Sequence, residues 1–223
     1  MLNKILIIAP HPDDESLGCG GTILKNINEG HDVYWAICTT VDKDFGWDEN
    51  KINKRELEIV KIGKAYGFKQ VFNLKMPSSK LETIPIQTLI NKFKNIINQI
   101  EPNIVYIPFN FDVHTDHQII SKVFSSFTKW FRYPSINTVL MYETLSETNF
   151  NFGSTEKYSP NIYVDISKYF KKKVSISKMY NSELKKHPFP RSVEAINALS
   201  ILRGSEAGFK HAEAFQLILK REV

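Results

Sequence analysis

Two short clusters of histidines and carboxylates contain most of the residues that could carry out chemistry. The first is residues 11–15, with the sequence HPDDE, and the second is residues 112–117, with the sequence DVHTDH. Imidazole and carboxylate together suit Zn²⁺, and a catalytic zinc takes three protein ligands and leaves one position for water. His11, Asp14 and His117 provide such a set. The residue types therefore indicate a metal site, provided that the fold brings the two clusters together.

The remaining polar residues of the two clusters suggest a division of roles around such a metal. Of two adjacent carboxylates, one can bind the metal while its neighbour, Asp13, accepts a proton from water activated by the metal. His114 could stabilise a developing oxyanion or protonate a leaving amine. Asp112 and Asp116 are suited to hold the imidazole rings by hydrogen bonds and so to fix their tautomers.

Apolar, β-branched runs alternate with stretches of helical periodicity along the first half of the chain. We expect strands over residues 4–9, 32–40, 70–74 and 103–108, and helices over residues 18–30, 50–66 and 84–100. Strands that alternate with helices predict a parallel sheet with helices on both faces. We therefore expect an α/β fold with a Rossmann-like, doubly wound and mostly parallel sheet in three αβα layers. Residues 1–223 are expected to form it as a single domain.

The order of the strands decides whether the two clusters meet. Right-handed crossovers favour the order 3-2-1-4, with later strands beyond the fourth. In that order the first and fourth strands are neighbours, and ligands bind beyond their carboxyl ends, where the winding changes direction. Residues 11–15 follow the first strand and residues 112–117 follow the fourth. The topology therefore predicts that the clusters lie side by side.

The second half of the chain has weaker signals. Thr115 is expected to be a helix N-cap, because Gln118 three residues later completes a capping box. The apolar stripe of this helix is expected to be core and consists of Ile120, Phe124, Phe127 and Phe131. Further strands are expected over 138–143 and 161–166, followed by a helical C-terminal third. Residues 146–160 are polar and turn-rich and are expected to be a surface loop.

Composition limits the class of protein. The 223 residues are 42% hydrophobic and 24% charged, and no stretch approaches the roughly 18 apolar residues of a transmembrane helix. The apolar start is too short for a signal peptide, so we expect a buried strand there. With only two cysteines a disulfide framework is excluded, and we expect a cytoplasmic location.

The chain carries a net charge of +5, and part of the excess lies in residues 171–173 and 185–186. These lysines could form a solvated basic face, or they could attract anionic substrates such as phosphorylated sugars. No nucleic-acid motif accompanies them, so we expect a small-molecule partner rather than nucleic acid.

Several segments together resemble one known family. Residues 9–22, APHPDDESLGCGGT, closely resemble the signature of the PIG-L/LmbE family of zinc-dependent N-deacetylases, and residues 114–117, HTDH, match its second motif. The resemblance continues in residues 55–67, at 203–204 and at 212–215. It implies removal of an N-acetyl group from an N-acetylglucosamine-type amino sugar or its conjugate, such as a glycolipid, nucleotide sugar or glycoside.

The resemblance also implies roles for individual residues. His11, Asp14 and His117 would bind one Zn²⁺ per chain, or another divalent metal such as Fe²⁺. Asp13 would be the general base, and His114 would stabilise the oxyanion or act as an acid.

Two positions raise separate questions. Arg55 resembles the position that contacts substrate hydroxyls, although it could equally be a surface arginine paired with Glu56 or Glu58. Some relatives have a tyrosine where this chain has Asp112, and Tyr142 is one candidate to replace its hydroxyl.

Two alternative functions remain open at the level of sequence. A metal-dependent phosphoesterase would need more ligands than the two clusters offer. A non-catalytic Rossmann-like protein that binds nucleotides is less well matched, because Gly18, Gly20 and Gly21 lack the dinucleotide-binding spacing. We expect these glycines instead to let the start of a helix lie close to the metal loop. Residues 41–50, 75–83 and 144–160 are expected to form the rim of the site, and their aromatic residues could stack on a sugar: Phe45, Trp47, Phe150 and Phe152.

Overall fold

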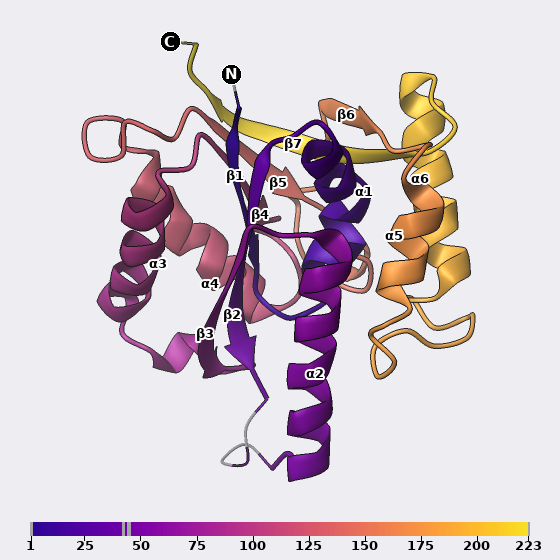
Figure 1. The fold of residues 1–223 in the computed structure, drawn as a ribbon, viewed down its shortest axis with the longest axis horizontal. Helices are drawn as coiled ribbons and strands as arrows, with labels where there is room; N and C mark the ends of the chain where they lie inside the picture. Colours follow the sequence, from indigo (N-terminus) through magenta and orange to yellow (C-terminus); the bar gives the residue numbers. More distant parts are fainter. Residues whose placement is uncertain (1, 42, 44–45, 223) are drawn as a thin grey trace.

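The computed structural model describes residues 2–41, 43 and 46–222 of the chain. Its centre is a seven-stranded sheet in the order β3-β2-β1-β4-β5-β7-β6 (Figure 1). The strands are β1 (Lys4–Ala9), β2 (Asp32–Thr40), β3 (Gln70–Pro77), β4 (Ile104–Pro108), β5 (Thr138–Tyr142), β6 (Ile162–Asp165) and β7 (Ala212–Lys220). β1 to β5 pair in parallel, whereas β7 is antiparallel to both β5 and β6. The predicted order 3-2-1-4 is confirmed.

Helices cover both faces of this sheet. They are α1 (Asp14–Asn28), α2 (Glu49–Tyr66), α3 (Ile86–Ile100), α4 (Thr115–Phe124), α5 (Phe170–Ser177) and α6 (Val193–Ala207). Figure 1 shows α3 and α4 on one side of the sheet and α1, α2 and α5 on the other. The predicted Rossmann-like, three-layer α/β fold is therefore confirmed. In the described ranges, no helix combines the length and apolarity that crossing a membrane requires.

The first strand shows why the sheet is buried on both faces. Successive side chains of a strand point to opposite faces, so Leu6 and Ile8 pack in the core cluster that contains α3 and α4. Ile5 and Ile7 pack in the opposite cluster, with residues of α1, α2 and α5. A strand covered on both sides must be apolar throughout. The apolar start of the chain is thus a core strand, as expected.

The start of α4 differs from the sequence-based expectation. The N-cap is His114, whose Nδ1 accepts the backbone N–H of Asp116 at 3.1 Å, and Thr115 is the first helical residue. The expected capping box is therefore wrong, because an imidazole nitrogen, and not the threonine hydroxyl, accepts the hydrogen bond that caps the helix. Of the predicted apolar stripe, Phe131 is also wrong: it lies beyond the helix and is 63% exposed.

The C-terminal third is less helical than predicted. After α6 the chain enters β7, which inserts between β5 and β6 and completes the sheet. The first half of β7, from Ala212 to Phe215, is buried, but its second half is mostly half-exposed. A strand is identified in a sequence by the alternation of buried apolar and exposed polar residues, and β7 does not show this alternation along its whole length.

Helix α1 lies unusually close to the strands it covers. A Cβ atom added to Gly21 would lie 2.6 Å from the side chain of Ile166, and one added to Gly18 would lie 2.4 Å from the ring of Tyr142. Contacts this short do not occur between real side chains, so only glycine fits at these positions. The glycines therefore allow close approach of the helix to Tyr142 and Ile166, not to the metal loop as expected from the sequence.

A buried ion pair is bonded to the middle of α1. Lys173 Nζ lies 2.6 Å from Glu213 Oε1 and donates to the carbonyl of Leu17 at 2.9 Å. Glu213 accepts the backbone N–H groups of Gly21 and Thr22 at 2.8 and 2.7 Å. An α-helix normally pairs the carbonyl of Leu17 with the N–H of Gly21, which lies four residues later. Both groups are bonded to the ion pair, which therefore ties α1 to α5 and to β7.

This arrangement corrects the expectation of a basic face at residues 171–173. Lys171 and Lys172 are exposed, but Lys173 is only 3% exposed and forms an ion pair with Glu213. Burial of a charged lysine is tolerated because its ammonium group is paired and hydrogen-bonded.

We predict that Lys173→Met lowers the free energy of unfolding by about 3–5 kcal/mol, because it leaves the carboxylate of Glu213 buried without its partner. The double variant Lys173→Met/Glu213→Gln should recover part of this loss, since no uncompensated charge remains. Urea denaturation of the wild type and both variants measures the difference. A single variant as stable as the wild type would contradict the importance of the pair.

Candidate metal centre and catalytic cleft

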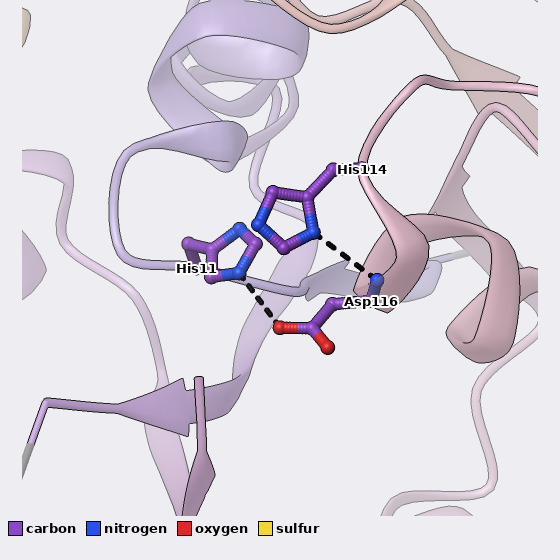
Figure 2. A group of neighbouring side chains, drawn as sticks. All are labelled: His11, His114 and Asp116. Atoms are coloured by element: carbon purple, nitrogen blue, oxygen red, sulfur yellow. Dashed lines mark hydrogen bonds and ion pairs between the residues drawn. The ribbon is translucent and has the colours of Figure 1, made fainter. Parts of the chain in front are cut away.

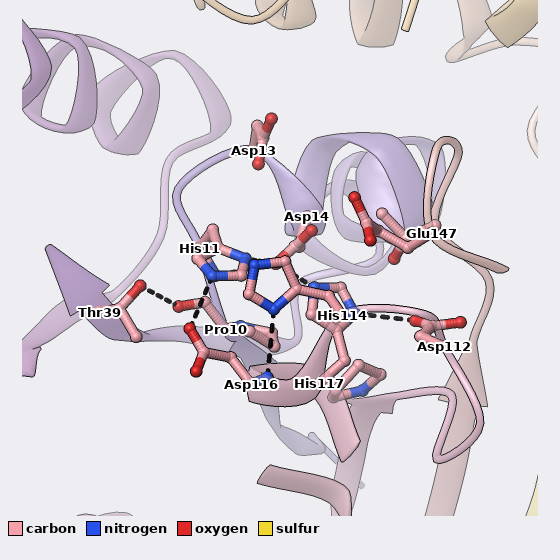
Figure 3. Close-up of polar contacts among 12 residues, drawn as sticks. Pro10, His11, Asp13, Asp14, Thr39, Asp112, His114, Asp116, His117 and Glu147 are labelled. Atoms are coloured by element: carbon pink, nitrogen blue, oxygen red, sulfur yellow. Dashed lines mark hydrogen bonds and ion pairs between the residues drawn. The ribbon is translucent and has the colours of Figure 1, made fainter. Parts of the chain in front are cut away.

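The two histidine–carboxylate clusters meet at one edge of the sheet. β1 and β4 are adjacent and parallel, with Ile5 opposite Ile104 and Ile7 opposite Tyr106. Their carboxyl ends therefore lie side by side, and the segments that follow them converge there (Figure 3). His11 comes from the loop after β1, Asp14 is the first residue of α1, and His117 lies in the first turn of α4.

Three side-chain atoms converge at this edge. Asp14 Oδ2 lies 3.4 Å from His11 Nδ1 and 3.3 Å from His117 Nε2. The ligand atoms of these three residues all lie within 4.8 Å of one another. The triad His11, Asp14 and His117 expected from the sequence is therefore brought together.

Each histidine of this triad contacts a second carboxylate through its other ring nitrogen. Asp112 Oδ2 lies 2.8 Å from His117 Nδ1, and Asp116 Oδ2 lies 3.0 Å from His11 Nε2. Both pairs leave the other ring nitrogen turned toward Asp14. Metal-binding histidines are typically oriented in this way.

One nitrogen in this centre forms no hydrogen bond. His117 Nε2 is buried and lies 3.3 Å from Asp14 Oδ2, but within the described part of the chain it has no hydrogen-bond partner. Burying a polar atom without a partner is costly. This nitrogen, a nitrogen of His11 and a carboxylate oxygen of Asp14 together form a set of ligands that fits a divalent cation such as Zn²⁺.

A second group of possible ligands overlaps the first and consists of His11, His114 and Asp116 (Figure 2). The carboxylate of Asp116 is already engaged, because it accepts the backbone N–H groups of Ser79 at 2.7 Å and Leu81 at 3.2 Å besides contacting His11. His114 Nδ1 likewise accepts a backbone N–H. The first triad is therefore the better metal site.

The electrostatics of the triad also favour a cation. Burial alone would lower the pKa of His11, but hydrogen bonds to Asp116 and Asp14 outweigh it and raise the pKa to about 9. Burial would raise the pKa of Asp14, but the charges and hydrogen bonds of His117 and His11 lower it well below its usual range. Positive charge is thus stabilised between these carboxylates, and a divalent cation would supply it.

Asp13 stands beside the triad in a strained conformation. Its φ is 131°, in the region that favours glycine, and its backbone N–H donates to Glu15 Oε2 at 3.1 Å. Arg191 Nη1 donates to Asp13 Oδ2 at 2.9 Å. Burial and the charge of Asp14 raise the pKa of Asp13 to about 8, although Arg191 opposes this. Backbone strain is retained mainly where a side chain must be held for function.

His11, Asp13, Asp14 and His114 line a cleft with a volume of about 180 Å³. Its wall also includes Ser78 and Glu147, from the expected rim segments 75–83 and 144–160, and two residues that the sequence analysis did not assign to a function, Glu183 and Arg191. Glu183 and Arg191 lie in the irregular segment between α5 and α6 and belong to no recognisable motif. Only the fold brings them to the cleft.

Arg55 also lines the cleft, but it is not free. Its guanidinium forms ion pairs with Glu183 and, at 3.7 Å, with Glu58. The alternative pairing with Glu58 is therefore present, and Glu183 is an additional partner. The side chain is only 11% exposed, so Arg55 is not a solvated surface residue.

The suggestion that Tyr142 supplies a hydroxyl to the site is wrong. Tyr142 is fully buried, and its hydroxyl donates to the carbonyl of Ile8 at 2.8 Å. Of the aromatic rim residues, Trp47 lines the cleft, whereas Phe150 and Phe152 are 40% and 81% exposed. Phe45 lies outside the described residues.

Comparisons with known proteins agree with the resemblance. A family model described as PIG-L, GlcNAc-PI de-N-acetylase, matches residues 6–128, more than half of the chain. The diacetylchitobiose deacetylase of Thermococcus kodakarensis is 23% identical over 228 residues, which cover 97% of this chain and 84% of that protein. A probable N-acetyl-alpha-D-glucosaminyl L-malate deacetylase 2 of Bacillus cereus is 28% identical over 131 residues, 55% of this chain and 59% of that protein.

A solved structure gives the same result for the fold. The N,N'-diacetylchitobiose deacetylase of Pyrococcus horikoshii, in complex with its inhibitor, superposes with a TM-score of 0.77 at 20% identity. The match covers 97% of this chain and 84% of that one.

We predict that Asp112→Ala lowers the affinity for Zn²⁺ by about 10–100-fold, because it removes the carboxylate that orients His117. Competition with a chromophoric chelator measures this affinity. Asp32→Ala is the matched control, since Asp32 lies at the opposite end of the sheet and pairs with Lys69. Equal affinities in the two variants would rule out an orienting role for Asp112.

We further predict that Asp13→Gly raises the free energy of unfolding by about 1 kcal/mol or more, because glycine adopts φ near 131° without strain. Asp13→Asn serves as the reference: it also removes the charge but keeps a Cβ at the strained position. Urea denaturation in the presence of a chelator compares the two. A glycine variant less stable than the asparagine variant would show that the backbone is not strained.

Proposed function

The chain belongs to the PIG-L family of GlcNAc-PI de-N-acetylases, and on this basis we propose that it is a zinc-dependent N-deacetylase. Its substrate would be an N-acetylglucosamine-type amino sugar or a conjugate of one. The observation that carries the proposal is the convergence of His11, Asp14 and His117. Asp13 lines the same cleft as His11 and Asp14. The deacetylases of acetylated amino sugars among its relatives support this substrate class.

In the proposed mechanism, His11, Asp14 and His117 hold the metal. A divalent ion in such a site supplies Lewis acidity and lowers the pKa of water. Asp13, which lines the cleft beside Asp14, accepts the proton of the attacking water. Arg191 contacts the same carboxylate and keeps it oriented toward the cleft.

His114 is proposed to stabilise the oxyanion that develops on the amide carbonyl. Burial, followed by the charges of His11 and His117, lowers the pKa of His114 to about 4, so its ring is neutral near pH 7. Because Nδ1 accepts a backbone N–H, the hydrogen of the neutral ring lies on Nε2. A neutral donor at the wall of the cleft fits oxyanion stabilisation better than proton donation to the amine.

The structure also bears on the extent of the domain and on the cellular location of the protein. The family model ends at residue 128, but β5, β6 and β7 lie in the same sheet as β1, and α5 and β7 bond to α1 through Lys173 and Glu213. We therefore propose that residues 1–223 form one deacetylase domain. Cys19 and Cys38 are free and buried, which fits the expected cytoplasmic location.

A two-metal phosphoesterase is less well supported. The second group of candidate ligands shares His11 with the first, and its carboxylate, Asp116, already accepts three hydrogen bonds. Two separate metal positions would need ligands that do not overlap in this way.

We predict that the purified protein contains about one zinc per chain and releases acetate from N-acetylglucosamine derivatives, and that a chelator abolishes this release. Asp13→Ala should lower turnover by at least about 10²–10⁴-fold while retaining the metal, because it removes only the proton acceptor. His117→Ala should lose the metal. Metal analysis and acetate assays on the same samples distinguish the two effects.

Two results would contradict this assignment. Equal loss of metal in both variants would show that the roles of Asp13 and His117 are wrongly divided. A protein that binds no divalent metal would exclude the proposed function itself.

A further inference from the structure

The cleft contains more acidic than basic side chains, and its basic side chains are already paired. Among the described residues, its charged lining consists of Asp13, Asp14, Glu147, Glu183, Arg55 and Arg191, apart from histidines. With Asp13 ionised, as its role as a proton acceptor requires, four carboxylates against two guanidinium groups leave two negative charges. One divalent cation balances these and leaves no excess of positive charge for an anionic substrate.

The two arginines are held by carboxylates on both sides. Arg191 Nη1 lies 2.9 Å from Asp13 Oδ2 and 3.3 Å from Glu183 Oε2. Arg55 pairs with Glu183 and also with Glu58, which lies behind it on α2. A guanidinium that is already neutralised attracts an anionic substrate far less than a free one does.

Glu147 is the cleft carboxylate without a charged partner. Its side chain accepts a hydrogen bond from Ser146 Oγ at 3.0 Å, and no ion pair of Glu147 is formed within the ranges that the structure describes. Figure 3 shows it on the far side of Asp14 from the loop of His11, near the rings of His114 and His117. A substrate whose acetamide lies at the metal would therefore pass this carboxylate.

The position of Glu147 is fixed by its neighbours. Its backbone N–H donates to the carbonyl of Thr144 at 3.1 Å, and its own carbonyl accepts the N–H of Val113 at 3.4 Å. The next residue, Thr148, donates from Oγ1 to Asp112 Oδ1 at 2.6 Å. The segment is thus tied to the carboxylate that orients His117, so the Glu147 backbone is fixed beside the cleft and an anionic ligand cannot easily displace it.

From this charge arrangement we propose that Glu147 is a specificity-determining residue, which makes the cleft select uncharged amino sugars over those that carry an anionic group. This inference rests on the proposed function and narrows its substrate class. It opposes the alternative, left open by the sequence, that the lysines attract an anionic substrate, because these lysines do not line the cleft. A fixed like charge in a partly desolvated cleft repels an anion more strongly than one in open solvent.

The test compares N-acetylglucosamine with its 6-sulfate on the zinc-loaded protein, since a sulfate ester adds negative charge while being a weak metal ligand. We expect kcat/KM to be at least about tenfold higher for the uncharged sugar, and this preference to shrink as ionic strength rises. Glu147→Gln should reduce the preference several-fold, chiefly by lowering KM for the sulfate. Glu156→Gln, on the exposed continuation of the same loop, is the matched control and should leave it unchanged.

Equal or better turnover of the sulfate by the wild type would overturn the inference, and so would a preference that Glu147→Gln leaves unaltered. If neither sugar releases acetate, the proposed function fails, but the inference is still decided by calorimetric binding of the same two sugars. Tighter binding of the uncharged sugar that weakens to parity in Glu147→Gln would support it. No measurable preference in binding would overturn it.

Discussion

Asp14 Oδ2 lies within 3.4 Å of a ring nitrogen of both His11 and His117, and it also accepts the backbone N–H of His11 at 2.8 Å. One carboxylate oxygen thus joins the segment after β1 to the segment after β4. This contact exists only because the two strands are neighbours and run parallel. The outer carboxylates, Asp112 and Asp116, would have no rings to orient if the strands were separated. The candidate metal site, the cleft and the placement of Asp13 all follow from this adjacency.

Three consecutive acidic residues at the start of α1 are buried, and each is compensated differently. Asp14 faces two histidines, Asp13 is paired with Arg191, and Glu15 accepts hydrogen bonds from Ser16 and Tyr180. Burial still raises the pKa of Glu15 to about 7. Buried carboxylates are tolerated near a helix N-terminus because the helix dipole favours negative charge there. The free-energy cost of burying these carboxylates that still remains would be lowered by a cation bound at Asp14.

The part of the site that could be predicted from the sequence is the part that lies directly after regular strands. His11, Asp14 and His117 could be placed because a buried apolar strand precedes each cluster and the winding rules make those strands neighbours. Arg191 and Glu183 could not, because they lie in an irregular segment whose path depends on tertiary packing, and for Glu147 only the rim segment 144–160 could be named, not the residue. The cap at His114 was missed for a related reason: Thr115 has the usual chemistry of a cap, and only the geometry shows that the ring acts instead. β7 was missed because half of it is only partly covered.

The bonds between Glu213 and the middle of α1 join two segments that are made at very different times during synthesis of the chain. Glu213 accepts the N–H groups of Gly21 and Thr22, which are separated from it by 192 and 191 residues. During synthesis, α1 emerges from the ribosome long before β7 exists, so its bonds to Glu213 can form only after residue 213 has been added. The helix that presents Asp13 and Asp14 is therefore tied to the completed sheet only after that point. A nascent chain would bring the ligands near one another before it could hold them rigidly.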